Sequence, residues 1–167
     1  EKIHSEKVSM LVVAIGKAMN LNNEEIKVLK TAGLMHDIGK IAISDSILNK
    51  KDVLTDSEYE TVQKHPETGY QILKSVDHYS ELADYALSHH ERYDGKGYPR
   101  GLKGEEIPLF ARIITVADSY EAMTSDRPYR KAMTKEEALK ELKRNSSTQF
   151  DSKIVEFFIK LSNELKL

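Results

Sequence analysis

The sequence predicts an all-α protein: a single-domain bundle of helices with polar groups at its core. Apolar residues recur at helical spacing in successive segments, N-cap residues precede several of those segments, and no stretch alternates like a β-strand. The 167 residues are enough for one well-buried core and short for two domains. We therefore expect one domain over residues 1–167, and we interpret it as cut from a longer protein because it begins with Glu1.

The first predicted helix carries a histidine on its inward face, and the second ends in a histidine–aspartate pair. The apolar stripe that shares a face with His4 consists of Val8, Leu11, Val12 and Ile15. Asn22 and Glu25 form a capping box that opens the second helix. This helix leads to His36-Asp37, and we expect Gly39 to end it.

A loop and two further helices follow. Residues 40–54 show no clear period and are predicted to form a structured loop, held to the core by Ile41, Ile43, Ile47 and Leu48. Thr55 and Glu58 form a second capping box. The helix that they open should end near His65, because Pro66 disfavours helical geometry in the residue before it. Pro66 itself suits the first turn of the next helix.

The second half of the chain contains one long loop between helices. After a turn at Asp77, an apolar helix leads into His89-His90. Residues 91–107 are rich in glycine and proline, which predicts a loop. Pro108 suits the first turn of a long apolar helix that contains Asp118. The last two helices are predicted to begin at the capping residues Thr134 and Asp151.

The composition limits the partners and the compartment. The 25 basic and 27 acidic side chains leave a net charge of -2, which gives no general attraction to nucleic acid or to anionic membranes. With 0 cysteines, disulfides and thiolate metal sites are excluded, as suits a reducing compartment. The apolar run over residues 10–15 is far shorter than the roughly 20 residues that span a bilayer. We expect a cytoplasmic protein with no bulk nucleic acid and no membrane contact.

Ionisable residues gather at the boundaries of the predicted apolar helices. They are His4, His36, Asp37, His65, His89 and His90, while Asp118 lies inside a helix and His78 falls in a turn where we expect it to be solvated. A single such histidine is more often a satisfied core or capping residue. Buried together without a counter-charge, however, these groups would carry a large desolvation cost, which a bound metal ion would remove.

The number and type of these groups indicate the chemistry. Five imidazoles and two carboxylates are too many for one tetrahedral zinc ion. They suit two neighbouring six-coordinate ions that share a bridging carboxylate and a bridging water, and iron or manganese fits such a site. Paired ions of this kind provide hydroxide near neutral pH and stabilise an in-line displacement at phosphorus. The sequence therefore predicts a phosphoester hydrolase.

Together with these residues, the Gly97-Tyr98-Pro99 loop after His89-His90 resembles the HD-GYP family of cyclic di-GMP phosphodiesterases. The resemblance covers essentially the whole chain. The run over residues 89–99 is its most specific part, and shorter matches are Ile107-Pro108, Arg127-Pro128-Tyr129 and Phe150-Asp151. It implies a helical fold of the HD phosphodiesterase type with metals in its core. It also implies that a metal-bridging hydroxide opens cyclic di-GMP to pGpG and continues in some cases to GMP.

The resemblance also assigns roles to particular residues. The implied metal ligands are His4, His36, Asp37, His65, His89, His90 and Asp118, with Asp37 bridging. The implied contacts to a substrate phosphate are Lys40, Tyr98, Arg127 and Arg130. Independently of the resemblance, Lys40 lies one turn beyond His36, and Arg127 could hold a phosphate or a guanine edge bidentately. Gly97 lets the backbone approach a ligand closely, and Pro99 favours an extended conformation at Tyr98.

Three departures from the family pattern bear on these assignments. Arg130 stands where many relatives have lysine, which keeps the charge but changes its geometry. Glu121 stands where aspartate is commoner, and we expect this difference to alter a contact to the base. Some relatives bind a third metal through a glutamate four residues before the first ligand histidine, a position that precedes residue 1. Glu1 could replace it on the same helix face, so two or three metal ions stay open.

Two alternative functions also stay open. The first is an HD-type phosphohydrolase acting on another nucleotide, and the second is a module that binds a cyclic dinucleotide, or docks onto a cyclase domain, without turnover. The expected partners are cyclic di-GMP, a cyclase domain and an upstream sensor or receiver domain.

Overall fold

Capping boxes open three of the helices at the residues that the sequence indicates. The side chains of Asn22, Thr55 and Thr134 each accept a hydrogen bond from the backbone N–H three residues further on, and the glutamate there accepts one from the N–H of the cap residue. Each such cap stabilises its helix by about 1 kcal/mol. Asp151 similarly accepts a hydrogen bond from the N–H of Lys153 at the start of the last helix. The predicted helix starts at these four caps are confirmed.

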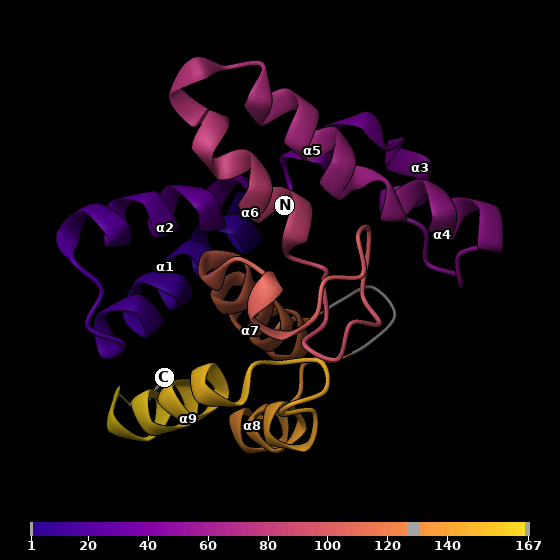
Figure 1. Ribbon diagram of the computed structural model, residues 1–167. Coiled ribbons are helices and arrows are strands. Elements are labelled where there is room, and N and C mark those ends of the chain that lie inside the picture. The colour runs from indigo at the N-terminus through magenta and orange to yellow at the C-terminus, as the bar shows by residue number, and fades with distance from the viewer. Residues whose placement is uncertain (1, 127–130, 166–167) are drawn as a thin grey trace.

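The computed structural model describes residues 2–126 and 131–165, and within these ranges it contains helices and no β-strand (Figure 1). The α-helices are α1 (Lys2–Ala18), α2 (Asn23–Met35), α3 (Asp45–Leu48), α4 (Asp56–Gln63), α5 (His65–Lys74), α6 (Ala83–Ser88), α7 (Leu109–Thr124), α8 (Lys135–Arg144) and α9 (Ser152–Leu165). The 3₁₀ helices are η1 (Ile38–Ala42), η2 (Asp77–Leu82) and η3 (Gly104–Glu106). The predicted all-α class is confirmed. None of the described helices combines the length and the apolar character needed to cross a bilayer.

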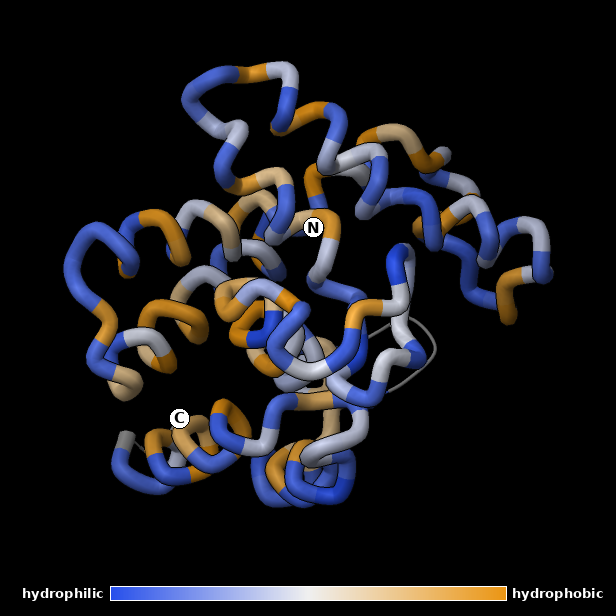
Figure 2. The backbone as a smooth tube through the Cα atoms, in the orientation of Figure 1, coloured by the Kyte–Doolittle hydropathy of each residue, from blue (hydrophilic) through white to orange (hydrophobic). Residues whose placement is uncertain are grey.

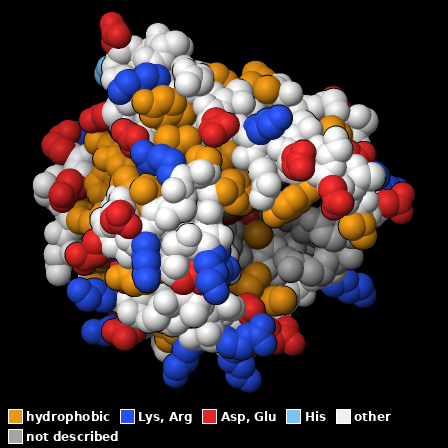
Figure 3. Space-filling view, turned by 45° about the vertical axis from the view of Figure 1, so that its right-hand side comes forward, with side chains coloured by type: hydrophobic (Ala, Val, Ile, Leu, Met, Phe, Trp, Pro, Cys, Tyr) orange, Lys and Arg blue, Asp and Glu red, His pale blue; other side chains and the backbone are white. Residues whose placement is uncertain are grey.

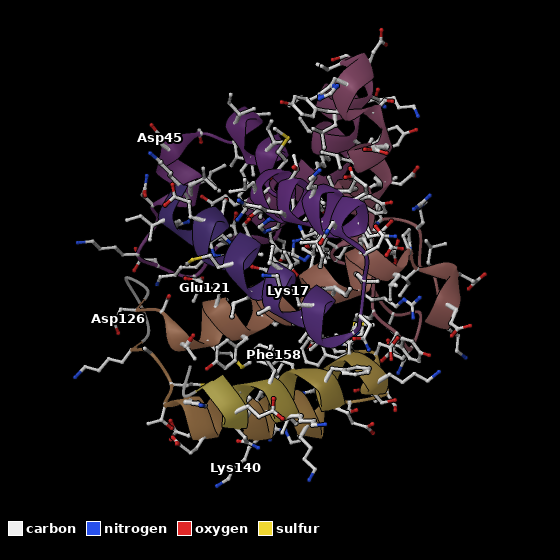
Figure 4. All side chains as sticks on the ribbon, turned by 90° about the vertical axis from the view of Figure 1, so that its left-hand side faces the viewer. Lys17, Asp45, Glu121, Asp126, Lys140 and Phe158 are labelled. Carbon is white, nitrogen blue, oxygen red and sulfur yellow. The ribbon has the colours of Figure 1, made fainter. Side chains whose placement is uncertain are left out.

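Helix α7 lies at the centre of the bundle. It packs against α1, α2 and α6, and also against α8 and α9, which lie below it in Figure 1. Its Ile113 and Ile114 are fully buried, as is Phe158, which Figure 4 shows on the side of α9 that faces α7. Along α9, hydrophobic and hydrophilic residues alternate at helical spacing, so one face of the helix covers the core (Figure 2). The bundle therefore surrounds α7, the helix that carries Asp118.

The segment between α2 and α4 is more helical than expected. Residues 40–54, predicted as a loop, contain most of η1 and all of α3. Ile43 is buried as predicted, but Ile41 is 81% exposed, so its predicted role in holding the segment to the core is wrong. In a short 3₁₀ turn only part of the apolar set can face inward, and Ile41 lies on the outer side of that turn.

Gly39 does not end the second helix. Helix α2 ends at Met35, and Gly39 is buried inside η1. A Cβ atom at Gly39 would lie 1.9 Å from the carbonyl oxygen of His65 and 2.5 Å from the backbone nitrogen of Gly69. Glycine is thus required because η1 packs directly against the backbone of α5, which brings Asp37 close to His65.

Candidate metal centre

The seven predicted ligand residues come from five helices and meet in the core. His4 belongs to α1, His36 and Asp37 follow α2, His65 begins α5, and Asp118 lies in α7. His89 and His90 follow α6 directly. Helix ends supply most of these side chains, because a chain that leaves a helix can turn its polar groups toward one point.

Asp37 lies at the middle of this cluster. Its Oδ1 is 3.2 Å from Nε2 of His65 and 3.5 Å from Nε2 of His89. Its Oδ2 is 3.4 Å from Nε2 of His36 and 3.6 Å from Nε2 of His4. The two carboxylate oxygens therefore face different groups of imidazoles.

Two potential metal sites share Asp37. One group consists of Asp37, His65, His89 and His90, and the other of His4, His36 and Asp37, with the ligand atoms of each group within 4.8 Å of one another. Asp118 adds an oxygen to the second group, since its Oδ1 is 3.2 Å from Nε2 of His4. A carboxylate between two such groups is the arrangement expected for a bridging ligand.

The imidazole rings are oriented by hydrogen bonds on the side away from the cluster. Nδ1 of His36 donates to the carbonyl of Gly33 at 2.8 Å. His65 and His89 make the same contact with the carbonyls three residues before them, at 2.7 and 2.6 Å. Because a carbonyl only accepts, each Nδ1 carries the proton and each Nε2 presents a lone pair to the cluster. This is the tautomer that a metal ligand requires.

The inward-facing nitrogens need a cation. Nε2 of His36 is buried and has no hydrogen-bond partner among the residues that the structure describes. Nε2 of His65 lies 3.3 Å from Nε2 of His89, so two lone pairs face each other. Both observations are unfavourable in a buried site unless a positive charge lies between the rings. The residues present therefore fit a divalent metal centre of nitrogen and oxygen ligands.

The electrostatics of the cluster agree with this interpretation. Burial raises the pKa of the Asp37 carboxyl, but the facing imidazoles of His36, His4 and His65 outweigh it and hold that pKa well below its usual range. Burial lowers the pKa of His4, but Asp118 and Asp37 outweigh it and raise the pKa to about 10. For His90, burial and the neighbouring His89 hold the pKa well below 6.5. Ionised carboxylates beside imidazoles attract either a proton or a metal ion, and the two compete.

The predicted substrate-binding residues lie beside the cluster where the structure describes them. Nζ of Lys40 is 2.6 Å from Oδ2 of Asp37. The ring of Tyr98 stacks on His90 with centroids 5.0 Å apart and an interplanar angle of 14°. A Cβ atom at Gly97 would lie 2.3 Å from the backbone nitrogen of Arg92, so this position requires glycine, and Pro99 follows Tyr98 through a cis peptide bond. Arg127 and Arg130 lie outside the described residues.

Sequence reasoning missed the structural roles of two buried carboxylates, Glu121 and Glu91, beside this site. Glu121 is 4% exposed, and its Oε2 is 2.6 Å from Nδ1 of His4. Figure 4 labels Glu121 on α7, on the side of that helix toward α1. Glu121 thus contacts a candidate ligand, and the expectation that a contact to the base is altered at this position stays a prediction. Glu91 accepts hydrogen bonds from the N–H groups of Arg100 at 2.7 Å and Leu102 at 3.0 Å, which fixes the loop of Tyr98. The helical spacing of Glu121 from Asp118 was the one available signal. His78 is exposed, as expected.

A helical bundle with a buried carboxylate between two groups of imidazoles is an arrangement that fits the HD class of proteins. Residues 2–154 match the HD domain family, and the chain belongs to that family. It is 42% identical to a cyclic di-GMP phosphodiesterase of Thermotoga maritima over 97% of this chain and 45% of that protein. It is 41% identical to the cyclic di-GMP phosphodiesterase response regulator RpfG of Xanthomonas campestris over 93% of this chain and 42% of that protein. The predicted resemblance to cyclic di-GMP phosphodiesterases is confirmed.

A further relative and two solved structures complete the comparison. The chain is 40% identical to a 3'3'-cGAMP-specific phosphodiesterase of Vibrio cholerae over 98% of this chain and 35% of that protein. It thus spans less than half the length of the curated relatives described here. The HD-GYP protein Bd1817 of Bdellovibrio bacteriovorus superposes with a TM-score of 0.79 at 20% identity, over 99% of this chain and 52% of that one. A cyclic GMP-AMP phosphodiesterase of V. cholerae superposes with a TM-score of 0.73 at 23% identity, over 98% of this chain and 44% of that one. At these identities the two structural similarities show the fold alone.

Proposed function

We propose that this chain is a metal-dependent phosphodiesterase that hydrolyses cyclic di-GMP to linear pGpG, and pGpG further to GMP. The observation that carries the proposal is the position of Asp37, whose two carboxylate oxygens face two separate groups of imidazoles. The curated relatives named as cyclic di-GMP phosphodiesterases support the choice of substrate. Water adds to phosphorus and one P–O ester bond breaks, so that the ring opens with a free hydroxyl on the sugar.

The proposed centre takes two divalent ions, with iron or manganese favoured by ligands that are all nitrogen and oxygen. His65, His89 and His90 would hold one ion and His4, His36 and Asp118 the other, with Asp37 common to both. When bound, such ions supply a nucleophile at neutral pH and stabilise negative charge at phosphorus. The surrounding protein contributes orientation, because the backbone carbonyls behind the rings fix each Nε2 toward the cluster.

Two of the proposed substrate contacts, Lys40 and Tyr98, touch candidate ligands. The ammonium of Lys40 is held at Asp37. Its positive charge would therefore stabilise a phosphate bound between the two groups of candidate ligands. The ring of Tyr98 stacks on His90, so the side chain lies beside a proposed metal ligand. Arg127 and Arg130 complete the proposed contacts, and their positions are outside the described residues.

Metal analysis combined with product analysis tests the proposal. The chain is purified without oxygen, its iron and manganese are quantified, and it is incubated with cyclic di-GMP while pGpG and GMP are separated by chromatography. The proposal expects bound metal and the appearance of pGpG before GMP. Protein that carries and takes up neither ion, or that binds metal without releasing either product, would refute it.

A second candidate substrate is 3'3'-cGAMP, because a relative at 40% identity is named as specific for it. It differs from cyclic di-GMP in one base, so the same centre would cleave it. Comparing kcat/KM for the two dinucleotides, with other nucleotides as competitors, distinguishes these substrates from each other and from a broader phosphohydrolase. Binding without turnover would indicate the non-hydrolytic module.

A further inference from the structure

Lys40 lies between two cavities. The first, of about 410 Å³, is lined on the α1 and α2 side by residues such as Ser5 and Leu34. The second, of about 690 Å³, is lined by the segment between α3 and α4 and by α4 itself. Lys40 and Leu48 line both cavities, so they form the wall between them. A phosphate held at Lys40 would therefore have room for a substituent on either side.

The second cavity combines an aromatic ring with apolar and polar groups. Tyr59 and Val53 line it and are 52% and 92% exposed, which is unusual for side chains of their kind. Asp52 and Asp56 also line it, and neither makes a salt bridge within the described part of the chain. Lys50, by contrast, is paired with Glu58 at 2.6 Å. The volume is within the range of about 300 to 1,000 Å³ found for small-molecule sites.

This cavity adjoins the candidate metal centre through Lys40. Lys40, which lines it, contacts Asp37 directly. On the face of the molecule that Figure 3 shows, hydrophobic side chains border a hollow. A molecule bound beside Asp37 would thus lie next to Lys40, a residue that lines the cavity.

We infer that this cavity holds one guanine base of the substrate, with the ring of Tyr59 stacked on the base and the carboxylates of Asp52 and Asp56 at its edge. The inference rests on the proposed function. Aromatic stacking suits any base, but carboxylates accept hydrogen bonds only. Guanine presents two donors, N1–H and the N2 amino group, on the edge where adenine presents the acceptor N1. The two aspartates therefore favour guanine over adenine.

Truncation of Tyr59 tests the stacking. In the metal-loaded chain, Tyr59→Ala should raise KM for cyclic di-GMP about 10-fold, equivalent to about 1.4 kcal/mol. Inhibition by inorganic phosphate, which has no ring to stack, should be much less affected. Tyr59→Phe, which keeps the ring, should retain most of the affinity. An equal loss for cyclic di-GMP and for phosphate, or no loss for either, would overturn the stacking role.

The aspartates are tested by base selectivity. The double variant Asp52→Asn/Asp56→Asn should lower the ratio of kcat/KM for cyclic di-GMP to that for cyclic di-AMP by about 10-fold or more. Asp77→Asn, an exposed aspartate that likewise begins a helical turn, is the matched control and should leave the ratio as it is. An unchanged ratio in the double variant would overturn the assignment of guanine.

Calorimetric binding of cyclic di-GMP separates this inference from the proposed function. If the wild-type chain binds the dinucleotide without hydrolysing it, the proposed function fails, and weaker binding by Tyr59→Ala still supports the base site. If the wild-type chain hydrolyses it and both Tyr59→Ala and the double variant bind it equally well, the base site fails alone. If the metal-loaded chain neither binds nor hydrolyses any cyclic dinucleotide, both are overturned.

Discussion

Replacing Glu121 by glutamine should weaken one of the two proposed metal sites and spare the other. The carboxylate is buried, lies 2.6 Å from Nδ1 of His4 and also accepts a hydrogen bond from the hydroxyl of Ser125 at 2.5 Å. Glutamine keeps the shape but removes the negative charge that makes His4 a more basic ligand. His4 takes part only in the group with His36 and Asp37, so the group of His65, His89 and His90 keeps its ligands.

The size of the effect follows from the kind of contact. Loss of a carboxylate behind a ligating histidine typically costs about 10- to 100-fold in metal affinity. That corresponds to about 1.4 to 2.7 kcal/mol, which is small against the roughly 10 kcal/mol or more that bound metals contribute to structural sites. We therefore expect a folded protein in which one metal equivalent is released readily to a chelator and the other is retained.

Competitive titration with a metal chelator, followed by metal analysis of the protein, measures both sites. Ser125→Ala is the matched control, because it removes a partner of Glu121 and leaves the carboxylate beside His4. It should change the affinity by less than Glu121→Gln does. If Glu121→Gln binds metal at each site as tightly as the wild-type chain does, His4 is not a ligand held by this carboxylate.

Three further perturbations address other parts of the site. Asp37→Asn should lower metal occupancy and with it hydrolysis, whereas Lys40→Met should keep the metals and slow turnover by removing charge stabilisation worth a few kcal/mol. Metal content and turnover are measured on both variants. Full occupancy with wild-type hydrolysis in Asp37→Asn would contradict the bridging role. Glu91→Gln should leave one buried backbone donor unsatisfied and lower the free energy of unfolding, measured by denaturant titration, by about 1 to 3 kcal/mol. An unchanged stability would mean that the loop does not depend on this carboxylate. Gly97→Ala should destabilise the protein by about 1 to 3 kcal/mol and raise KM, because the added methyl group meets backbone atoms; a thermal scan and substrate kinetics would reveal it, and a neutral result would contradict the close packing.

The parts of the structure that could be predicted are those fixed by local chemistry. Asn22, Thr55 and Thr134 cap helices because their partners lie three residues away in the same chain. The clustering of His36 with His65 and His89 could be predicted because unpaired imidazoles at helix ends have few stable environments. Their role as metal ligands stays a prediction.

The parts that could not be predicted depend on contacts between distant segments. Gly39 resembles a helix stop in sequence, yet it is required by the backbone of His65, 26 residues away. Ile41 looks like a core residue, and only the direction of the turn places it outside. Glu121 is separated from His4 by 117 residues, so no local pattern indicates that they form a pair. The cavity beside Tyr59 likewise forms only once α3 and α4 are placed.

The carbonyl groups behind His36, His65 and His89 have a consequence for how the protein would take up the proposed metal ions. Each of these hydrogen bonds joins a ring to a carbonyl only three residues earlier, so it forms with the local turn and needs no other part of the fold. The rings are consequently fixed before any ion arrives, and loading should require little reordering of side chains. Ordering a mobile side chain on binding costs about 0.5 to 1.5 kcal/mol, so three rings fixed in advance spare the ion several times that amount. The folded chain should thus take up metal quickly from solution and give it up slowly.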